Sequence, residues 1–311
     1  MKSGPNSPAL MAKRISGVGE LKNQYKGVLL DQFGVLHDGR KPYPGAIHAL
    51  QEMHRSGMKV VLLSNSSQRA DKAYVRLEGM GFQREWIAGV VTSGELAFRH
   101  LRDRPNSFWS NLGRKVLHFT WGSRGKVSLD GLGLEVVSNP SEADFILAHG
   151  TETIAQPNAD PLPASVDQMK EVLAECISAK NGEKSIPMIV ANPDLVTVDT
   201  TSLKLMPGTL GKEYERLGGH VEWMGKPAPI IYTSAMQMIG MEPSEVVAIG
   251  DSLDHDIEGA IGAGIDSLFI CGGIHASDVA LNGDAIDAEK LEALFDRQSA
   301  EPTFYTSYFK S

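Results

Sequence analysis

The chain has 311 residues, 42% of them hydrophobic, and a formal net charge of -8. This length exceeds the size at which one hydrophobic core usually stops growing, so two domains are expected. The acidic balance argues against nucleic acid as a partner, and no apolar stretch is long enough to span a membrane. Cys176 and Cys271 are far apart and outside any zinc-ligand spacing, which favours a reducing, cytoplasmic location.

The first twenty residues have the composition of an extension. Lys2, Lys13 and Arg14 occur among serines, and no acid precedes Glu20. We expect residues 1–20 to form a disordered extension, with an organelle transit peptide as the alternative.

Two short apolar runs with a helical pattern between them predict a βαβ unit. Residues 27–31 form a buried-strand pattern that ends on Asp31, and residues 60–63 form another that ends at Ser64. The spacing of apolar residues predicts a helix over residues 43–56. The two strands are therefore expected to be parallel.

The middle of the chain, residues 97–221, has its own succession of elements. Strands are predicted over residues 115–120 and 145–149, a helix over 165–179, and an exposed loop over 156–163. We expect this segment to be an inserted α/β domain.

The C-terminal part of the chain has the same strand–helix–strand pattern as the N-terminal part. Residues 246–249 form a buried-strand pattern before Asp251, followed by a helix to about residue 264 and a strand over 267–270. The fold class is therefore expected to be α/β, with a Rossmann-like doubly wound parallel sheet built from residues 1–96 and 222–311. Ligands bind outside the carboxyl ends of such strands.

Polar residues follow three of these strands. Asp31 precedes an Asp38-Gly39 hairpin signal, which predicts a small flap, although an aspartate that ends a strand often only caps a turn. Ser64 and the residues after it could bind an anion or, equally well, form the N-cap of the next helix. Lys226, before Pro227, places an ammonium group at a helix start.

The most specific cluster is the acidic loop after residues 246–249. Asp251, Asp254 and Asp256 lie within six residues. Such carboxylates repel one another unless a cation is present, and their oxygens suit Mg²⁺. A metal site is favoured over a simple helix N-cap.

The order and spacing of these four motifs resemble the haloacid dehalogenase superfamily. The long insertion between the second and third motifs resembles the class II cap of its nitrophenyl and sugar phosphatase subgroup. Three further stretches fit that subgroup: Thr92-Ser93-Gly94, Ala143-Asp144 and Ala191-Asn192-Pro193-Asp194. Dimerisation through the cap is a further expectation from the subgroup.

The resemblance implies Mg²⁺-dependent hydrolysis of a small phosphorylated metabolite. Asp31 would attack phosphorus, and Ser64 and Lys226 would hold the phosphoryl oxygens. The implied ligands of Mg²⁺ are Asp31, the backbone carbonyl of Phe33, Asp251 and Asp256, with Asp254 peripheral. The implied substrate-binding residues are Asn65, Ser66, Asn192 and Asp194, although Asn-Pro-Asp is also a common turn sequence.

Phe33 departs from the family's pattern. Phosphatases of the family carry a second aspartate at this position, which protonates the leaving oxygen and later activates water. Such assistance contributes roughly a hundred- to ten-thousand-fold, so turnover should be weakened, most for alkyl phosphates. His37 or His255 could replace the acid, but ordinary turn or surface histidines are the favoured interpretation.

Two alternatives follow from Phe33. Family dehalogenases also carry an aromatic residue here, but the acidic loop and the class II cap favour the phosphatases. The second alternative is a catalytically degenerate protein that binds a phosphate ligand. The presence of Asp31 argues against it, because an extra negative charge would repel that ligand.

Overall fold

The computed structural model describes residues 11–123, 127–178, 185–199 and 202–311, which divide into two compact units. The first unit runs to residue 63 and also contains residues 74–90 and 232–311. The second contains residues 64–73 and 91–231. The domain boundaries expected from the sequence, at residues 96/97 and 221/222, stay a prediction.

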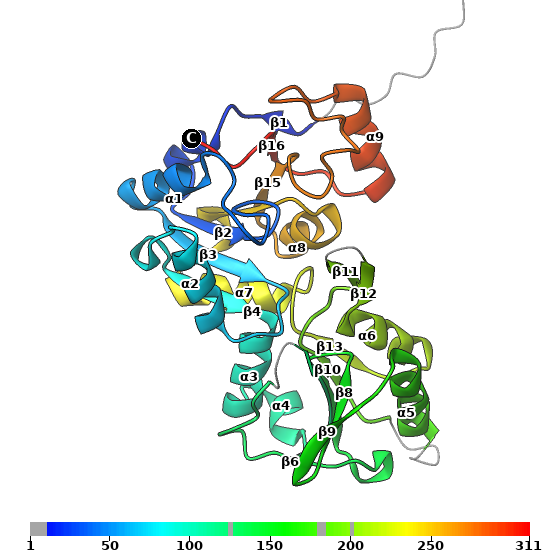
Figure 1. The fold of residues 1–311 in the computed structure, drawn as a ribbon. Helices are drawn as coiled ribbons and strands as arrows, with labels where there is room; N and C mark the ends of the chain where they lie inside the picture. Colours follow the sequence, from blue (N-terminus) through cyan, green and yellow to red (C-terminus); the bar gives the residue numbers. More distant parts are fainter. Residues whose placement is uncertain (1–10, 124–126, 179–184, 200–201) are drawn as a thin grey trace, which may run out of the picture. The chain divides into compact units, whose positions relative to one another are not determined.

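The first sheet has the strand order β1-β16-β15-β14-β2-β3-β4 within the described part of the chain (Figure 1). Its strands are β1 (Lys13–Arg14), β2 (Gly27–Asp31), β3 (Lys59–Ser64), β4 (Gly89–Thr92), β14 (Val246–Gly250), β15 (Asp266–Ile270) and β16 (Phe304–Thr306). The pairs β2/β3, β14/β2, β14/β15, β15/β16 and β1/β16 are parallel. This confirms the predicted parallel α/β sheet.

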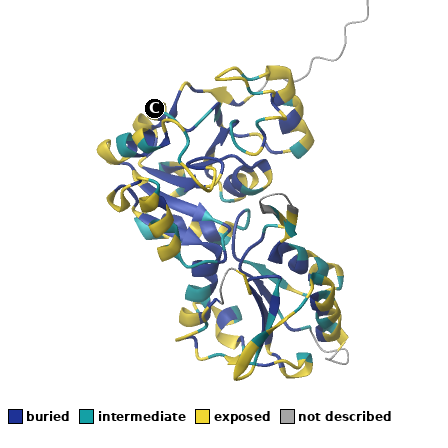
Figure 2. Ribbon diagram, viewed as in Figure 1, coloured by how far each residue is buried: buried dark blue, intermediate teal, exposed yellow. Residues whose placement is uncertain are grey.

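The burial of the central strands explains their unbroken apolar sequences. Every residue of β2 and of β14 is buried, as expected where both faces of a parallel sheet are covered (Figure 2). The accompanying helices are α1 (Ala46–Arg55), α2 (Ala70–Gly79), α7 (Pro229–Ile239), α8 (Glu258–Gly262) and α9 (Ala288–Gln298). Short 3-10 turns are η1 (Val18–Asn23), η2 (Arg84–Trp86) and η4 (Pro243–Glu245), and η5 (Leu253–Ile257) is a π-helical turn.

Helix α1 shows how the sequence sets the packing. Its buried residues are Ala46, Ala49, Leu50 and Met53, a spacing that places them on one face. Gly57, with φ +83, ends the segment in a conformation that favours glycine.

The second sheet has the strand order β13-β10-β7-β5-β8-β9, with β6 paired to β5. Its strands are β5 (Lys115–Thr120), β6 (Glu135–Val136), β7 (Phe145–Ala148), β8 (Thr153–Gln156), β9 (Ala159–Pro163), β10 (Met188–Val190) and β13 (Val221–Trp223). The other elements are α3 (Ser93–Asp103), α4 (Ser107–Asn111), η3 (Pro140–Glu142), α5 (Val166–Ser178), α6 (Pro207–Arg216) and the hairpin of β11 (Val196–Asp199) and β12 (Ser202–Leu205). Side chains of α5 and α6, among them Met169, Leu173 and Tyr214, pack in one core with those of β5, β7 and β10.

Two expectations from the sequence are corrected. The loop predicted over residues 156–163 is mostly the strand β9, which pairs with β8 at the edge of the sheet. Pro161 and Pro163 suggested a loop, but an edge strand tolerates proline because its outer amides need no partner in the sheet.

The disordered extension predicted for residues 1–20 is not observed over residues 11–20. Residues 13–14 pair with β16, and the side chains of Ile15 and Val18 are buried. The basic, serine-containing composition suggested disorder, but Lys13 and Arg14 occupy exposed positions of a paired strand. The rest of the predicted extension, residues 1–10, lies outside the described residues.

Candidate functional site

Three carboxylates meet at the carboxyl end of the first sheet. Asp31 ends β2, and Asp251 directly follows β14, which is the parallel neighbour of β2. One oxygen from each of Asp31, Asp251 and Asp256 lies within 4.8 Å of the others, and all three residues are buried. The structure thus brings together the three side chains predicted to bind a metal.

The acidic loop holds Asp256 inward through local hydrogen bonds. The backbone amide of Ser252 donates to Oδ2 of Asp256 at 3.1 Å. The hydroxyl of Tyr232 donates to the backbone carbonyls of His255 and Asp256. Asp254, expected to be peripheral, is exposed and outside the cluster.

Glycines leave the space that the carboxylates occupy. A Cβ atom on Gly34 or Gly273 would overlap the carboxylate of Asp251, and one on Gly250 would overlap that of Asp256. In addition, the backbone amide of Ile274 donates to Oδ2 of Asp251 at 2.8 Å. The sequence alone predicted no role for the Gly273 loop, because a glycine turn has no specific signature.

Residues 33–42 form the predicted flap after Asp31. Isolated β-bridges join Phe33 to His37 and His37 to Pro42, and the amide of Gly34 donates to the carbonyl of His37 at 3.0 Å. The Phe33 side chain is 58% exposed, and its ring packs edge-on against that of His37 at 6.3 Å between centroids. The flap therefore presents an aromatic ring at the position where the family resemblance led us to expect an acid.

His37 is poorly suited to replace that acid. Burial, together with the nearby charge of Arg76, lowers the pKa of His37 to about 4, so the ring is neutral at pH 7. Its Nδ1 atom accepts a hydrogen bond from the amide of Gly39 at 3.0 Å, which leaves the proton on Nε2. This supports the interpretation of His37 as a structural turn residue.

The carboxylate cluster fits a divalent cation. Three carboxylates this close repel one another, and hard oxygen ligands are those that Mg²⁺ prefers. The glycines around the cluster carry no Cβ atom that would overlap its carboxylates. The Asp31, Asp251 and Asp256 set therefore has the donor chemistry of a divalent-cation site.

A second group of predicted residues gathers in the second unit around Asn65. The Nδ2 atom of Asn65 donates to Oδ1 of Asp194 at 2.8 Å and to the backbone carbonyl of Lys226 at 3.2 Å. Its Oδ1 accepts from the backbone amide of Lys226 at 2.8 Å. Asn65 thus fixes the backbone of the lysine, a role that the sequence analysis did not predict.

The other predicted substrate-binding residues make local turns. Oδ1 of Asn192 accepts from the amide of Asp194 at 3.0 Å, as the turn interpretation of Asn-Pro-Asp expected. Ser64 Oγ accepts from the amide of Ser66, and Ser66 Oγ accepts from that of Gln68, both at 3.2 Å. Contacts of Asn65, Ser66, Asn192 and Asp194 with a substrate stay a prediction.

Residues 92–95 hold the loop that carries Ser64. The amide of Gly94 donates to the Ser66 carbonyl at 3.1 Å, and the Thr92 hydroxyl donates to the Gln68 carbonyl at 2.6 Å. The Ser93 hydroxyl lies 3.4 Å from the Ser64 carbonyl. A Cβ atom on Gly225, the residue before Lys226, would overlap this hydroxyl.

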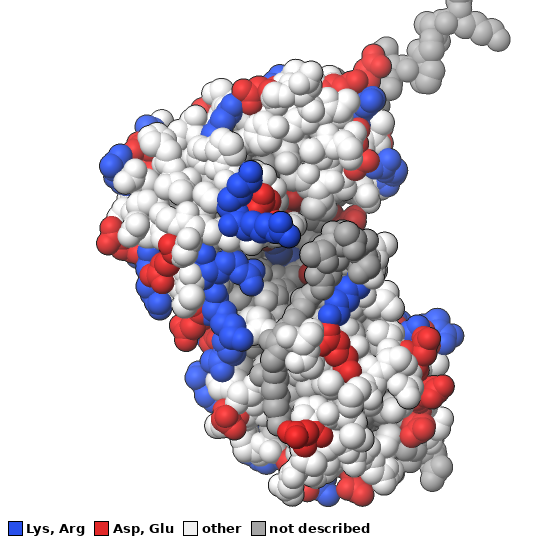
Figure 3. Space-filling model, viewed as in Figure 1, with Lys and Arg blue, Asp and Glu red and all other residues white. Residues whose placement is uncertain are grey.

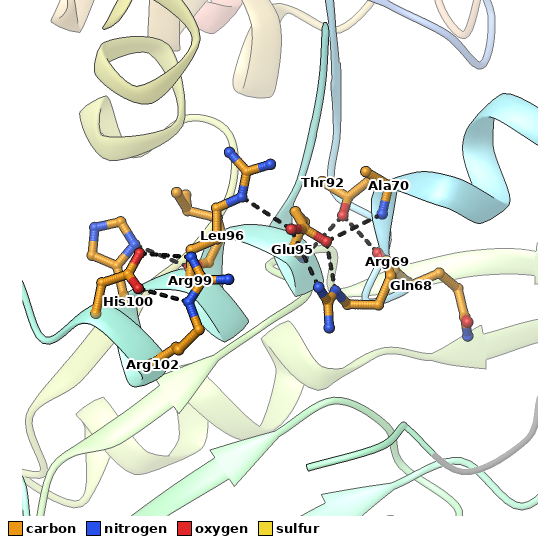
Figure 4. Close-up of polar contacts among 10 residues, drawn as sticks. Gln68, Arg69, Ala70, Thr92, Glu95, Leu96, Arg99, His100 and Arg102 are labelled. Atoms are coloured by element: carbon orange, nitrogen blue, oxygen red, sulfur yellow. Dashed lines mark hydrogen bonds and ion pairs between the residues drawn. The ribbon is translucent and has the colours of Figure 1, made fainter. Parts of the chain in front are cut away.

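Glu95 also helps to hold the loop that carries Ser64 (Figure 4). Its carboxylate accepts from Nε of Arg69 at 2.5 Å and from Nε of Arg99 at 3.0 Å. Burial opposes ionisation, but the two guanidinium groups hold the pKa of Glu95 below its usual value. Glu95 was not predicted from the sequence, although the adjacent Thr92-Ser93-Gly94 stretch was.

Comparison with known proteins identifies the family. A family model described as haloacid dehalogenase-like hydrolase matches residues 28–135, and another, described as HAD-hydrolase-like, matches residues 223–294. The chain belongs to the haloacid dehalogenase-like hydrolases. The two matches contain Asp31 and the acidic loop, and they confirm the predicted resemblance.

Relatives of this HAD-like hydrolase align over most of its length. It is 28% identical to phospholysine phosphohistidine inorganic pyrophosphate phosphatase of Rattus norvegicus over 84% of this chain and 85% of that one. A haloacid dehalogenase-like hydrolase from Brucella suis is 27% identical, with a TM-score of 0.67 and coverage of 94% and 98%. The p-nitrophenyl phosphatase from Archaeoglobus fulgidus shares the fold, at 22% identity, a TM-score of 0.64 and coverage of 92% and 97%.

The surface carries side chains of both charges. On the face shown in Figure 3, Lys and Arg as well as Asp and Glu reach the surface. No helix among the described residues is long and apolar enough to cross a membrane.

Proposed function

We propose that this HAD-like hydrolase is a Mg²⁺-dependent phosphatase of small phosphomonoesters that forms an aspartyl phosphate on Asp31. The observation that carries the proposal is the buried cluster of Asp31, Asp251 and Asp256 at the end of a parallel sheet. The names of its relatives support a phosphatase, since they include a nitrophenyl phosphatase and a phospholysine phosphohistidine inorganic pyrophosphate phosphatase.

Each proposed role follows from the chemistry of its residue. A carboxylate oxygen of Asp31 attacks phosphorus, and Ser64 and Lys226 bind the phosphoryl oxygens, whose charge the lysine offsets. Asp31, Asp251, Asp256 and the carbonyl of Phe33 would hold Mg²⁺. When bound, Mg²⁺ supplies positive charge that stabilises the transferring phosphoryl group.

The proposal also includes substrate selection, cellular location and oligomeric state. Side chains of the cap, predicted over residues 97–221, would select the substrate, together with Asn65, Ser66, Asn192 and Asp194. A cytoplasmic location and a homodimer formed through the cap belong to the same proposal.

The test measures phosphate release from 4-nitrophenyl phosphate and a panel of metabolite phosphates, with and without Mg²⁺. Release should depend on Mg²⁺, disappear in Asp31→Asn and persist in Asp254→Asn, which removes a carboxylate outside the cluster. Release that persists in Asp31→Asn would contradict the proposal.

Phe33 favours a second candidate, a protein that binds a phosphate ligand without hydrolysing it. In that case the native chain should bind inorganic phosphate or vanadate with Mg²⁺ but release no product. Turnover that appears only in Phe33→Asp would establish this alternative. A dehalogenase is the least favoured reading, since displacing halide from carbon needs no metal site.

A further inference from the structure

Position 33 of the flap carries an exposed phenylalanine ring, which cannot donate or accept a proton. Phe33 lies two residues after Asp31, and its side chain has no exchangeable proton. The β-bridge to His37 and the hydrogen bond between Gly34 and His37 hold the flap backbone in place. A Cβ atom on Gly39 would lie 3.2 Å from the Phe33 ring, so the turn of the flap also packs closely against this side chain.

The imidazole and the carboxylate of the flap, on His37 and Asp38, are engaged in the turn itself. His37 is 1% exposed, and its Nδ1 lone pair accepts from the amide of Gly39. Oδ1 of the exposed Asp38 accepts from the amides of Arg40 and Lys41 at 2.9 Å. Neither His37 nor Asp38 is therefore arranged to act in place of an acid or base at position 33.

The proposed reaction has two halves, the transfer of the phosphoryl group to Asp31 and its release to water. The two halves depend differently on an acid or base at position 33. In the first, an Asp31 oxygen bonds to phosphorus, and the bond to the leaving oxygen breaks, with its electron pair remaining on that oxygen. An acidic phenol, enol or carboxylic acid leaves as an anion and needs no proton. An alcohol needs one, so an alkyl phosphate reacts slowly in this half.

The second half always involves water. A water oxygen bonds to phosphorus, the bond from phosphorus to Asp31 breaks, and the electron pair returns to the carboxylate while the water proton passes to solvent. Without a base this half loses the roughly hundred- to ten-thousand-fold that proton transfer contributes. With an acidic leaving group, only the second half is slowed.

We infer that the phosphoryl group remains on Asp31 and that this phosphoenzyme accumulates during turnover. The inference rests on the proposed function and specifies its substrate class: phosphate esters and mixed anhydrides with acidic leaving groups. Release of the phosphoryl group to water limits their turnover. Alkyl phosphates are turned over without accumulation, because their first half is slow.

The experiment mixes the Mg²⁺-loaded protein rapidly with 4-nitrophenyl phosphate and follows nitrophenolate and the intact protein mass. We expect a burst of about one nitrophenolate per chain, a slow steady phase, and a protein heavier by one phosphoryl group that hydroxylamine removes. Phe33→Asp should abolish the burst and raise the steady rate roughly ten-fold or more. Phe33→Leu, which removes the ring without adding an acid, should keep the burst.

The outcomes separate this inference from the proposed function. Steady release that depends on Asp31, with no burst and no phosphoenzyme, overturns the inference and leaves the phosphatase intact. Absence of both release and phosphoenzyme overturns both. A stoichiometric phosphoenzyme that never releases phosphate supports the accumulation and overturns the hydrolase.

Discussion

Asn65 binds the backbone of Lys226 at two points, accepting from its amide at 2.8 Å and donating to its carbonyl at 3.2 Å. The two residues are 161 positions apart in the chain. Both are buried, so these hydrogen bonds are shielded from water. The lysine's position therefore depends on the asparagine.

Asn65→Ala should weaken catalysis through Lys226. The substitution leaves buried backbone groups without their partners, at a cost of about 1–3 kcal/mol. We expect kcat/KM for 4-nitrophenyl phosphate to fall about ten- to hundred-fold. Asn106→Ala removes a helix-capping asparagine outside the candidate site and should lower only the free energy of unfolding. Equal kinetic losses in both variants would contradict the positioning role.

Glu95→Gln should loosen the loop that carries Ser64. The neutral amide keeps the shape of the side chain but loses the ion pairs with Arg69 and Arg99. We expect the free energy of unfolding in urea to fall by about 1–3 kcal/mol and KM to rise several-fold. Glu213→Gln breaks the exposed pair with Arg216 and serves as the control, with almost no expected change in either quantity.

Gly34→Ala should reduce Mg²⁺ affinity. Gly34 and Gly57 have similar φ angles, +86 and +83, so alanine strains the backbone at both. Only at Gly34 would the added Cβ overlap the Asp251 carboxylate, whereas no atom lies within 4 Å at Gly57. Thermal unfolding with and without Mg²⁺ should show a smaller shift in Tm for Gly34→Ala and the native shift for Gly57→Ala. Native Mg²⁺ shifts in both variants would disprove the clash.

Asp256→Asn should weaken Mg²⁺ binding far more than Asp254→Asn. Both substitutions remove one negative charge from the same loop, but only Asp256 belongs to the carboxylate cluster. We expect a roughly ten- to hundred-fold higher Kd for Asp256→Asn by calorimetry. Equal effects would indicate general electrostatics instead of direct coordination.

The free energy of unfolding should fall as the pH is lowered from about 6.5. Burial lowers the pKa of His149 from 6.5 to about 3, so the unfolded chain binds a proton that the folded chain excludes between these values. The loss is at most about 1.4 kcal/mol per pH unit for this residue. His149→Asn, which retains a polar atom at the position of Nδ1, should flatten the slope in urea titrations. An unchanged slope would assign the loss to other groups.

Local patterns in the sequence determined the elements and the order of the motifs. The strands over residues 27–31 and 115–120 were predicted with the bounds observed, because buried parallel strands are short apolar runs between polar residues. Asp31 and Asp251 could be expected at one edge, because Asp31 ends one such strand and Asp251 directly follows another. Phe33 could be recognised by its position after Asp31.

Only the tertiary structure decided which side chains and backbone groups, distant in the sequence, form hydrogen bonds at the candidate site. The contacts of Asn65 with Lys226, of Glu95 with Arg69 and of Ile274 with Asp251 join residues that are far apart in the chain. Such hydrogen bonds depend on three-dimensional direction and leave no periodic trace in a sequence. The pairing of Lys13 and Arg14 with β16 was hidden for the same reason, because a two-residue strand is specified by its partner.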